Sequence, residues 1–385
     1  MERQFMFTAV VLKIGALANF VSISVAEIAL GLLIILALIR VYKTKDFSVF
    51  KKTFFLFMLL MIAAETISTF AGVDPGRSLK DYTGFWVLFY LPAMYVIATD
   101  INKSEYLMYV YAGAIFATLF GIGELIFIKK NLQIRADGFF SHALTYGNVM
   151  ALISITALGE LFFRRTENKR YFYMTVAALL FSVTAVIFSG SRGSILSFLI
   201  AALFMIVYRY RLRGLIAGVC IVVFLVGIVS VVPSVKNRFT GIVENMSKST
   251  SSVGTRVVLW KASAKAIQKR PLFGYGKRNF KKEVSKYISV PTSSRAHAHN
   301  SYIQYTFLHG FFGLFAMLGF FASLFWEIGK RMKSDNFMKT AFFILLVFIL
   351  EGLTENNFTD SEVTIAGFSL IGLILANGSK GYRTG

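Results

Sequence analysis

The chain has 385 residues, of which 56% are hydrophobic and 40 are phenylalanine, and its formal net charge is +21. The chain contains repeated apolar runs, and these reach the roughly 18 residues needed to cross a bilayer core of about 30 Å. A helix satisfies its own backbone hydrogen bonds in lipid. The composition therefore excludes a soluble globular protein and predicts an all-α polytopic membrane protein.

About twelve membrane-spanning helices are predicted from the apolar runs, because charged clusters bound each of them. The expected spans are 4–20, 22–41, 53–72, 83–99, 105–128, 143–163, 171–188, 193–208, 214–232, 301–328, 337–353 and 362–377. The first span is short and contains Lys13. We expect it to be retained as an uncleaved signal.

The positive charges between the spans predict the orientation of the chain. With the N-terminus in the cytoplasm, alternate connections fall on the cytoplasmic side, and these connections carry the basic clusters. The clusters are Arg40, Lys43, Lys45, Lys51 and Lys52; Arg164, Arg165, Lys169 and Arg170; Arg209, Arg211 and Arg213; and Lys330, Arg331 and Lys333. Both termini are therefore expected inside the cell, and the long connection before span ten is expected outside.

The chain accordingly divides into residues 1–232 with spans one to nine, residues 233–300 as one large outer loop with short helices, and residues 301–385 with the last three spans and a cytoplasmic tail. The outer loop contains 14 Lys and Arg against two acids, Glu244 and Glu283, which gives a net charge of 14 − 2 = +12. A loop this long is expected to be functional, and its charge favours an anionic partner near the membrane surface. Nucleic acid is not expected, because no aromatic stacking platform or known binding motif accompanies the charge.

The first candidate site in chain order is the Ser-Gly-Ser-Arg-Gly-Ser stretch at residues 189–194, between spans seven and eight. These spans leave almost no room for a loop, so the stretch is predicted to be a turn at the outer interface. Glycine lets backbone N–H groups approach a ligand, and the helix that begins here presents its positive dipole end. With the forked guanidinium of Arg192, the turn is either a phosphate cradle or a tight turn whose arginine reaches lipid headgroups.

A helix is predicted over residues 253–270, between cap candidates at 251–252 and Pro271. One face carries a lysine stripe, which consists of Lys261, Lys265 and Lys269. Arg256 falls on the opposite, largely apolar face, where a guanidinium needs an anion or an ion-pair partner. Functional anion binding and structural ion pairing both fit this position.

The segment Arg-Ala-His-Ala-His-Asn at residues 295–300 directly precedes the apolar run of span ten. Neutral imidazole accepts a proton near pH 7, so His299 is suited to activating a hydroxyl group. Asn300 is expected either to orient a sugar or to cap the helix that follows. His297 is either an assisting residue or a bystander, and Arg295 is a candidate for a supporting role.

Acidic residues gather at the outer ends of spans eleven and twelve. They are Glu351, Glu355, Asp360 and Glu362. Three roles fit them: pairing with Arg192 or Arg256, orienting His299, or complementing the charge of the basic loop. The last role is the simplest, and Glu355 is kept as a supporting site residue. The chain contains no Asp-x-Asp pair and no His/Cys ligand spacing, so neither a metal nor a cofactor is expected.

Together these segments resemble the O-antigen ligase and O-antigen polymerase superfamily of bacterial envelope glycosyltransferases. The similar segments are RADGFFSH at 135–142 with YGN at 146–148, SGSRGS at 189–194, TRVVLW at 255–260, PLFGYG at 271–276, His299 and Asn300 followed by Gly310 and Gly313, and EGLTENNFTD at 351–360. The resemblance covers roughly residues 130–377 and keeps the order of the motifs. The N-terminal third is similar in hydropathy alone.

The resemblance implies a twelve-span fold of the glycosyltransferase C type in the bacterial inner membrane, with its site at the periplasmic face. Its donor would be a glycan on a polyprenyl pyrophosphate such as undecaprenyl pyrophosphate. Arg192 and Arg256 would bind the pyrophosphate, and His299 would activate the acceptor hydroxyl for inverting, metal-independent attack. The acceptor is lipid A–core in a ligase, another lipid-linked glycan in a polymerase, and a side chain in related protein glycosyltransferases. The resemblance favours the ligase.

A transporter of lipid-linked sugars is the competing class of protein. Such a protein is expected to place ionisable residues near the bilayer midplane and to contain repeated, broken helices. The polar residues of this chain instead gather on one side of the predicted membrane. An enzyme that works beside membrane lipids is therefore favoured.

Overall fold

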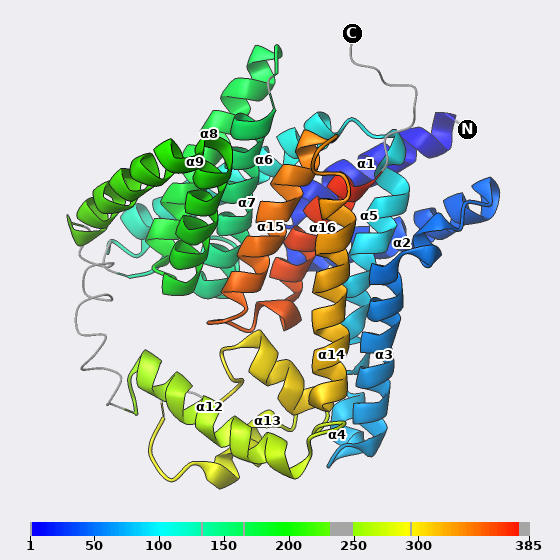
Figure 1. The fold of residues 1–385 in the computed structure, drawn as a ribbon, viewed down its shortest axis with the longest axis vertical. Coiled ribbons are helices and arrows are strands. Elements are labelled where there is room, and N and C mark those ends of the chain that lie inside the picture. Colours follow the sequence, from blue (N-terminus) through cyan, green and yellow to red (C-terminus); the bar gives the residue numbers. More distant parts are fainter. Residues whose placement is uncertain (1, 132–133, 165, 232–248, 293–294, 377–385) are drawn as a thin grey trace.

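The computed structural model describes residues 2–131, 134–164, 166–231, 249–292 and 295–376 (Figure 1). Every regular element within these ranges is helical. The main helices are α1 (Glu2–Ala18), α2 (Ile23–Thr44), α3 (Thr53–Ala71), α4 (Pro75–Leu79), η2 (Tyr82–Phe89), α5 (Tyr90–Ile97), α6 (Lys103–Gly123), α7 (Ala143–Phe163), α8 (Lys169–Ser189), α9 (Arg192–Val231), α12 (Ser252–Lys269), α13 (Phe280–Val284), α14 (Ser301–Gly329), α15 (Asn336–Glu351) and α16 (Ser361–Leu375).

Seven helices among the described residues are long and apolar enough to cross a membrane. They are α2, α3, α6 with its π-helical extension, α7, α8, the first part of α9, and α14. The apolar helices at Met6–Ala18, Gly84–Ile97 and Ser361–Leu375 are shorter. The prediction of an all-helical polytopic membrane protein is confirmed, whereas the number of twelve spans stays a prediction.

Helix α9 changes direction between the eighth and ninth expected spans. Arg211 has a φ of 54° and a ψ of −132°, which interrupts a stretch that is otherwise helical. The two parts of α9 run in different directions from this point (Figure 1). The interruption lies in the basic stretch at residues 209–213, where the sequence predicts the connection between two spans.

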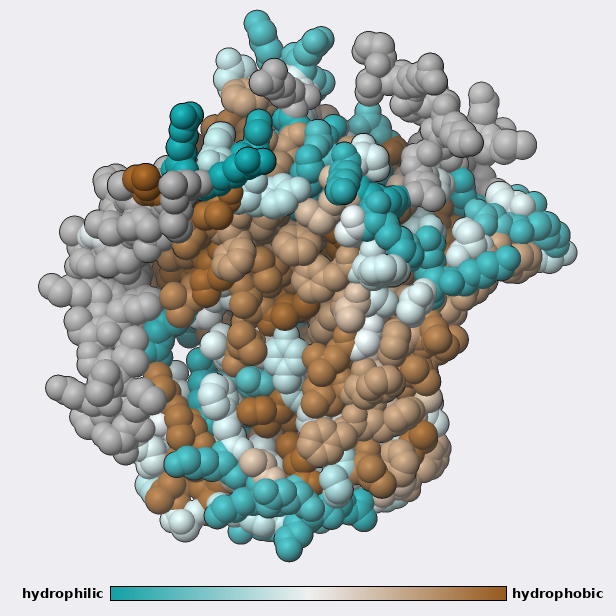
Figure 2. Space-filling model, viewed as in Figure 1, coloured by the Kyte–Doolittle hydropathy of each residue, from teal (hydrophilic) through white to brown (hydrophobic). Residues whose placement is uncertain are grey.

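The middle of the molecule carries an apolar belt that lies between two polar ends (Figure 2). Large apolar side chains are more than half exposed on the long helices, among them Ile28, Leu56, Leu180 and Phe315. Exposed apolar surface on helices of this length fits lipid rather than water. Helix α7 shows the opposite pattern, because α8, α9, α15 and α16 pack around it and bury it along most of its length.

The described residues between α9 and α14 form a layer at one end of the molecule. Helices α12 and α13 lie at the lower end of Figure 1, beside α4 and the lower ends of α3 and α14. We call residues 249–292 and 295–300 the loop module. Residues 233–248, which the sequence places in the same outer loop, lie outside the described residues.

A break in α14 anchors the loop module to the membrane-spanning helices. Gly310 has a φ of 68° and a ψ of −171°, a conformation that is essentially restricted to glycine. Backbone groups of α14 near the break bind residues 271–276 of the module. The N–H groups of Tyr275 and Gly276 donate to α14 carbonyls at 3.0 and 2.9 Å, and the N–H of Phe311 donates back to the module at 2.7 Å.

Gly310→Ala is expected to separate the loop module from α14. A Cβ atom at this position would lie 2.1 Å from the carbonyl oxygen of Leu272, and the backbone conformation alone would cost about 1–3 kcal/mol. Thermal unfolding in detergent should show a large loss of stability, and limited proteolysis should cut the module. Gly329→Ala is the control, since a Cβ there meets no atom within 4 Å. Equal losses in the two variants would contradict the anchoring role.

Candidate functional site

Helix α12 forms where the sequence predicts it and directs Arg256 away from solvent. Ser251 caps the helix by accepting a hydrogen bond from the N–H of Gly254 at 3.0 Å. The exposed face carries the predicted stripe of Lys261, Lys265 and Lys269. On the other side Leu259 is fully buried, and the Arg256 side chain is 16% exposed. The predicted helix and its two faces are confirmed.

The backbone at His299 is in the left-handed region directly before α14. Its φ of 50° is uncommon for a residue with a side chain and is typical of tightly held positions. The N–H of His299 donates to Nδ1 of His297 at 3.2 Å, and the two imidazole rings contact each other with centroids 4.1 Å apart. Asn300 caps α14, because its Oδ1 accepts from the N–H of Ile303 at 2.9 Å. His297 and the cap therefore fix the position of His299.

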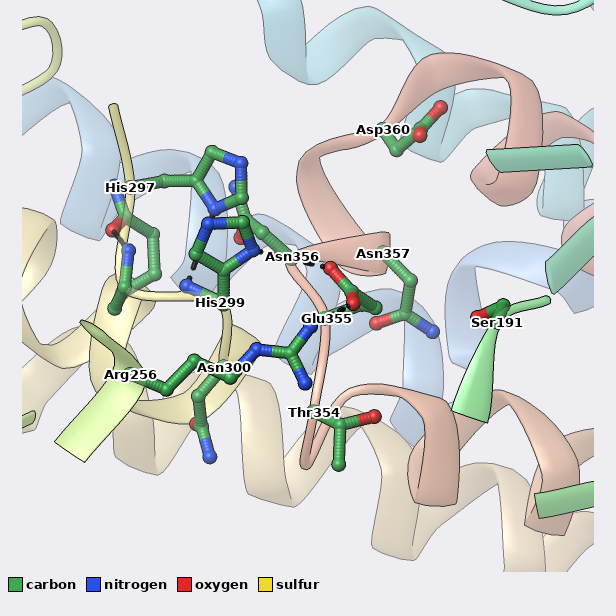
Figure 3. Close-up of polar contacts among 12 residues, drawn as sticks. Ser191, Arg256, His297, His299, Asn300, Thr354, Glu355, Asn356, Asn357 and Asp360 are labelled. Atoms are coloured by element: carbon green, nitrogen blue, oxygen red, sulfur yellow. Dashed lines mark hydrogen bonds and ion pairs between the residues drawn. The ribbon is translucent and has the colours of Figure 1, made fainter. Parts of the chain in front are cut away.

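Glu355 joins the arginine of α12 to the histidine before α14 (Figure 3). Its Oε1 forms an ion pair with the Arg256 guanidinium, and its Oε2 lies 3.3 Å from Nδ1 of His299. The Glu355 side chain is only 6% exposed, so both interactions are largely shielded from water. Shielding strengthens such electrostatic interactions and favours a preorganised site.

Hydrogen bonds between the start of α14 and the connection from α15 to α16 hold Glu355 in place. Asn300 Nδ2 donates to the Leu353 carbonyl at 2.9 Å. Ser301 Oγ lies 3.1 Å from the Glu355 carbonyl oxygen and 2.8 Å from Asn357 Oδ1. Asn300 thus has the predicted capping role, and the same residues fix the distance between Glu355 and His299.

Of the three roles that fit the acids at this end, Glu355 has the first two, because it pairs with Arg256 and contacts His299. Asp360 is also built into the helix ends. Its Oδ2 accepts from Thr145 Oγ1 at 2.6 Å, and its Oδ1 accepts from the N–H of Glu362 at 3.1 Å. Burial raises the pKa of the Asp360 carboxyl group. Both acids therefore act on neighbouring helices and not on exposed lysines.

The turn at residues 189–194 packs directly against the segment that carries Glu355. A Cβ atom on Gly193 would lie 2.2 Å from Thr354 Oγ1, so a larger residue would displace the Thr354 side chain. Figure 3 shows Ser191 on the far side of this segment from Arg256 and the two histidines. The turn therefore brings the backbone of Arg192, the first residue of α9, next to the same segment that binds Arg256 and His299.

The serines of this turn are engaged within the protein. Ser194 Oγ donates to Asn148 Oδ1 at 2.6 Å and lies 2.8 Å from Ser191 Oγ, while Ser189 Oγ donates to the Val186 carbonyl at 2.7 Å. These contacts show the tight turn that the sequence predicts. They assign the serine side chains to the turn itself, so Arg192 is the side chain that a phosphate cradle here would use.

Arg295 contacts other residues of the loop module. Its Nε donates to Thr292 Oγ1 at 2.9 Å, and its Nη1 donates to Ser285 Oγ at 3.3 Å. These hydrogen bonds tie Arg295 to other residues of the loop module. Arg295 is therefore placed to support the site through the shape of the loop.

Burial, together with the neighbouring His299 and Arg256 side chains, lowers the pKa of His297 to about 4. The ring is therefore neutral at pH 7, which agrees with Nδ1 acting as an acceptor for the His299 N–H. Its contacts are with the backbone and the ring of His299. His297 is thus a positioning residue for His299.

Acidification is expected to destabilise the protein through His297. In the unfolded chain His297 is protonated as the pH falls below its ordinary pKa of 6.5, whereas in the folded chain it stays neutral down to about pH 4. The free energy of unfolding therefore decreases as the pH falls across this window. Between pH 7 and pH 4, the unfolding temperature of the wild type should therefore fall more steeply than that of His297→Gln. Glutamine keeps an acceptor atom but does not titrate. Parallel curves would contradict the lowered pKa.

A cavity of about 420 Å³ lies beside His297 at the same end of the molecule. It is lined by α3, η2, the loop module, α14 and the connection before α16. Among the described residues, the lining includes His297 but not His299, Arg256 or Glu355. Within the same ranges, no three His, Cys, Asp or Glu side chains are grouped as metal ligands.

The long apolar helices and the polar site at their ends define an integral membrane protein. A family model described as O-antigen ligase matches residues 177–318. The matched region includes Arg192, Arg256 and His299. This match supports the O-antigen ligase superfamily, whose members are ligases or polymerases of the membrane glycosyltransferase type, for this part of the chain. A search of curated proteins finds no match to the chain.

Proposed function

We propose that this protein is a ligase that transfers a glycan from a polyprenyl pyrophosphate donor to a hydroxyl group of lipid A–core. The observation that supports this proposal is the carboxylate of Glu355, which contacts both Arg256 and His299. In the proposed orientation both termini are cytoplasmic and the loop module faces the periplasm, so the reaction takes place on the outer side of the inner membrane.

In this mechanism His299 is the general base. Nδ1–H donates to the Glu355 carboxylate, which leaves the lone pair of Nε2 to accept the proton of the acceptor hydroxyl. The acceptor oxygen attacks the anomeric carbon of the donor and forms the new glycosidic bond. The bond from the anomeric carbon to the phosphate oxygen breaks, the polyprenyl pyrophosphate leaves with the electron pair, and the configuration inverts.

Arg192 and Arg256 are proposed to bind the pyrophosphate of the donor. Negative charge grows on the pyrophosphate as it leaves, and preorganised cations that face this charge lower the barrier. A guanidinium carries five N–H donors, so the ion pair with Glu355 does not exhaust Arg256. The leaving group brings its own activation, and the proposed mechanism therefore requires no nucleotide or metal.

The test is the lipopolysaccharide pattern of a bacterium that lacks the gene. Loss of all polymer from lipid A–core is the expected result, because the ligase attaches the finished glycan. Core that carries a single repeat would identify a polymerase, and loss of a protein-bound glycan would identify a protein glycosyltransferase. A wild-type pattern of lipopolysaccharide and glycoproteins in the deletion strain would overturn the proposal.

A further inference from the structure

We infer that the cavity beside His297 is the acceptor subsite and that it binds a sugar ring of the acceptor glycan. This inference rests on the proposed function and adds the direction from which the acceptor reaches His299. The cavity volume of about 420 Å³ lies within the range of roughly 300–1,000 Å³ that is usual for small-ligand sites.

His297 connects the cavity to His299, because it lines the cavity and its ring contacts the His299 ring. Glu355 contacts the His299 imidazole and pairs with Arg256, and the His297 ring packs against the His299 ring at a tilt, with the centroids 4.1 Å apart. His297 is also part of the cavity wall. A ligand that touches His297 in the cavity is therefore next to the ring that contacts His299, whereas Arg256 and Glu355 do not line the cavity.

The cavity wall combines polar groups of both kinds with aromatic rings. Lys277 supplies donors and Glu65 supplies acceptors, and Gln304 supplies both. Phe85, Phe280, Tyr305 and Phe358 supply aromatic rings to the wall. A sugar ring presents hydroxyl groups at its edge and C–H groups on its faces, so this mixture fits a carbohydrate better than it fits a lipid chain.

The ion pair between Lys277 and Glu65 is the most specific polar feature of the wall. The two charged atoms lie 2.6 Å apart, and the side chains are 14% and 6% exposed. A buried pair of this kind contributes little net stability, because desolvation offsets its Coulomb energy. Ionisable residues near the membrane interior are usually functional, and here they offer a fixed donor and a fixed acceptor to ligand hydroxyls.

Gly84 provides a way to fill the cavity without touching the site at His299. It lines the cavity, and a Cβ atom there would meet only the end of the flexible Lys277 side chain, at 3.1 Å. Gly84→Phe is expected to raise the KM for purified lipid A–core acceptor by about tenfold, which corresponds to about 1.4 kcal/mol of binding. The KM for a polyprenyl pyrophosphate oligosaccharide donor should stay within about twofold of the wild-type value.

Unchanged acceptor KM in Gly84→Phe, or an increase confined to the donor KM, would overturn the inference. If Gly84→Phe fails to fold, the double variant Glu65→Gln/Lys277→Gln tests the same prediction, because it removes both charges and leaves neither unpaired. Lys261→Gln, on the exposed face of α12, is the matched control for loss of a lysine and should leave both KM values unchanged.

Photo-crosslinking in cells tests the occupant of the cavity directly. A photoreactive residue at Lys281, which lines the cavity, should form an adduct with lipid A–core even in a strain that makes no donor glycan. The same residue at Lys265 should not form this adduct. An adduct that requires donor synthesis, or no glycan adduct at all, would overturn the inference. The proposed function fails separately, if the wild type shows no transfer or His299→Ala retains it.

Discussion

His299→Ala is expected to lower glycan transfer by about 10²–10⁴-fold, the usual contribution of a positioned general base. His299 is the imidazole that contacts Glu355, at 3.3 Å, and its left-handed backbone is fixed by His297 and by the Asn300 cap. Transfer should be measured with purified protein in detergent or liposomes under saturating donor. The loss should fall on kcat, because the base acts on the acceptor proton during the chemical step.

His142→Ala is the matched control for His299→Ala. His142 is an exposed histidine at the start of α7, and its replacement should change transfer by no more than a few-fold. Both variants should show wild-type expression and thermal unfolding. Retention of wild-type kcat by a folded His299→Ala protein would remove His299 from the mechanism.

Glu355→Gln is expected to lower transfer by about 10²–10⁴-fold, although the residue need not touch either substrate. The amide loses the charge that stabilises the protonated imidazole, and it no longer enforces the orientation of His299, as for the acidic member of a catalytic triad. Because the two residues act as one unit, Glu355→Gln/His299→Ala should be no slower than His299→Ala alone. A double variant whose loss of transfer equals the product of the two single losses would contradict a positioning role.

The same substitution is also expected to reduce stability, and this effect can be separated from the catalytic one. Removal of the carboxylate leaves Arg256 largely buried without its ion-pair partner, which typically costs about 3–5 kcal/mol. The pair variant Arg256→Gln/Glu355→Gln should recover most of this loss in thermal unfolding. It should not recover transfer, since it also lacks the proposed pyrophosphate ligand. Recovery of activity together with stability would mean that the pair is structural.

The local elements of the site could be predicted because their signals lie in neighbouring residues. The repeat of lysines over residues 261–269 gives the exposed face of α12, and the same periodicity places Arg256 on the buried face. The turn at residues 189–194 follows from two apolar runs that leave no room for a loop. Helix periodicity and chain length are sufficient for such conclusions.

The partner of Arg256 could not be predicted in the same way. Glu355 is 99 residues away in the chain, and the sequence marks it as a supporting residue without choosing among its three possible roles. Only the packing of Gly193 against Thr354 and the hydrogen bonds of Ser301 single out this position. The pair is therefore a property of the tertiary structure, as is the cavity beside His297.

The break in α14 could not be predicted either. A glycine within an apolar span is common, and it changes no periodic pattern that would indicate a break. Gly310 belongs to a segment that resembles the superfamily, but the sequence assigns it no structural reason. The structure supplies that reason, since residues 271–276 hydrogen-bond to the broken helix. The expected span at 301–328 is present as α14, Ser301–Gly329, and Gly310 interrupts it.

The interruption at Gly310 sets where chimaeric proteins can be joined. Residues 271–276 and the first part of α14 exchange backbone hydrogen bonds across the break, so a transplant from a relative has to carry both partners as one block. A junction placed at the start of α14 would split this block and mismatch the contacts. A junction beyond Phe312 would keep it whole, which makes the later position the better crossover point for engineering new specificities.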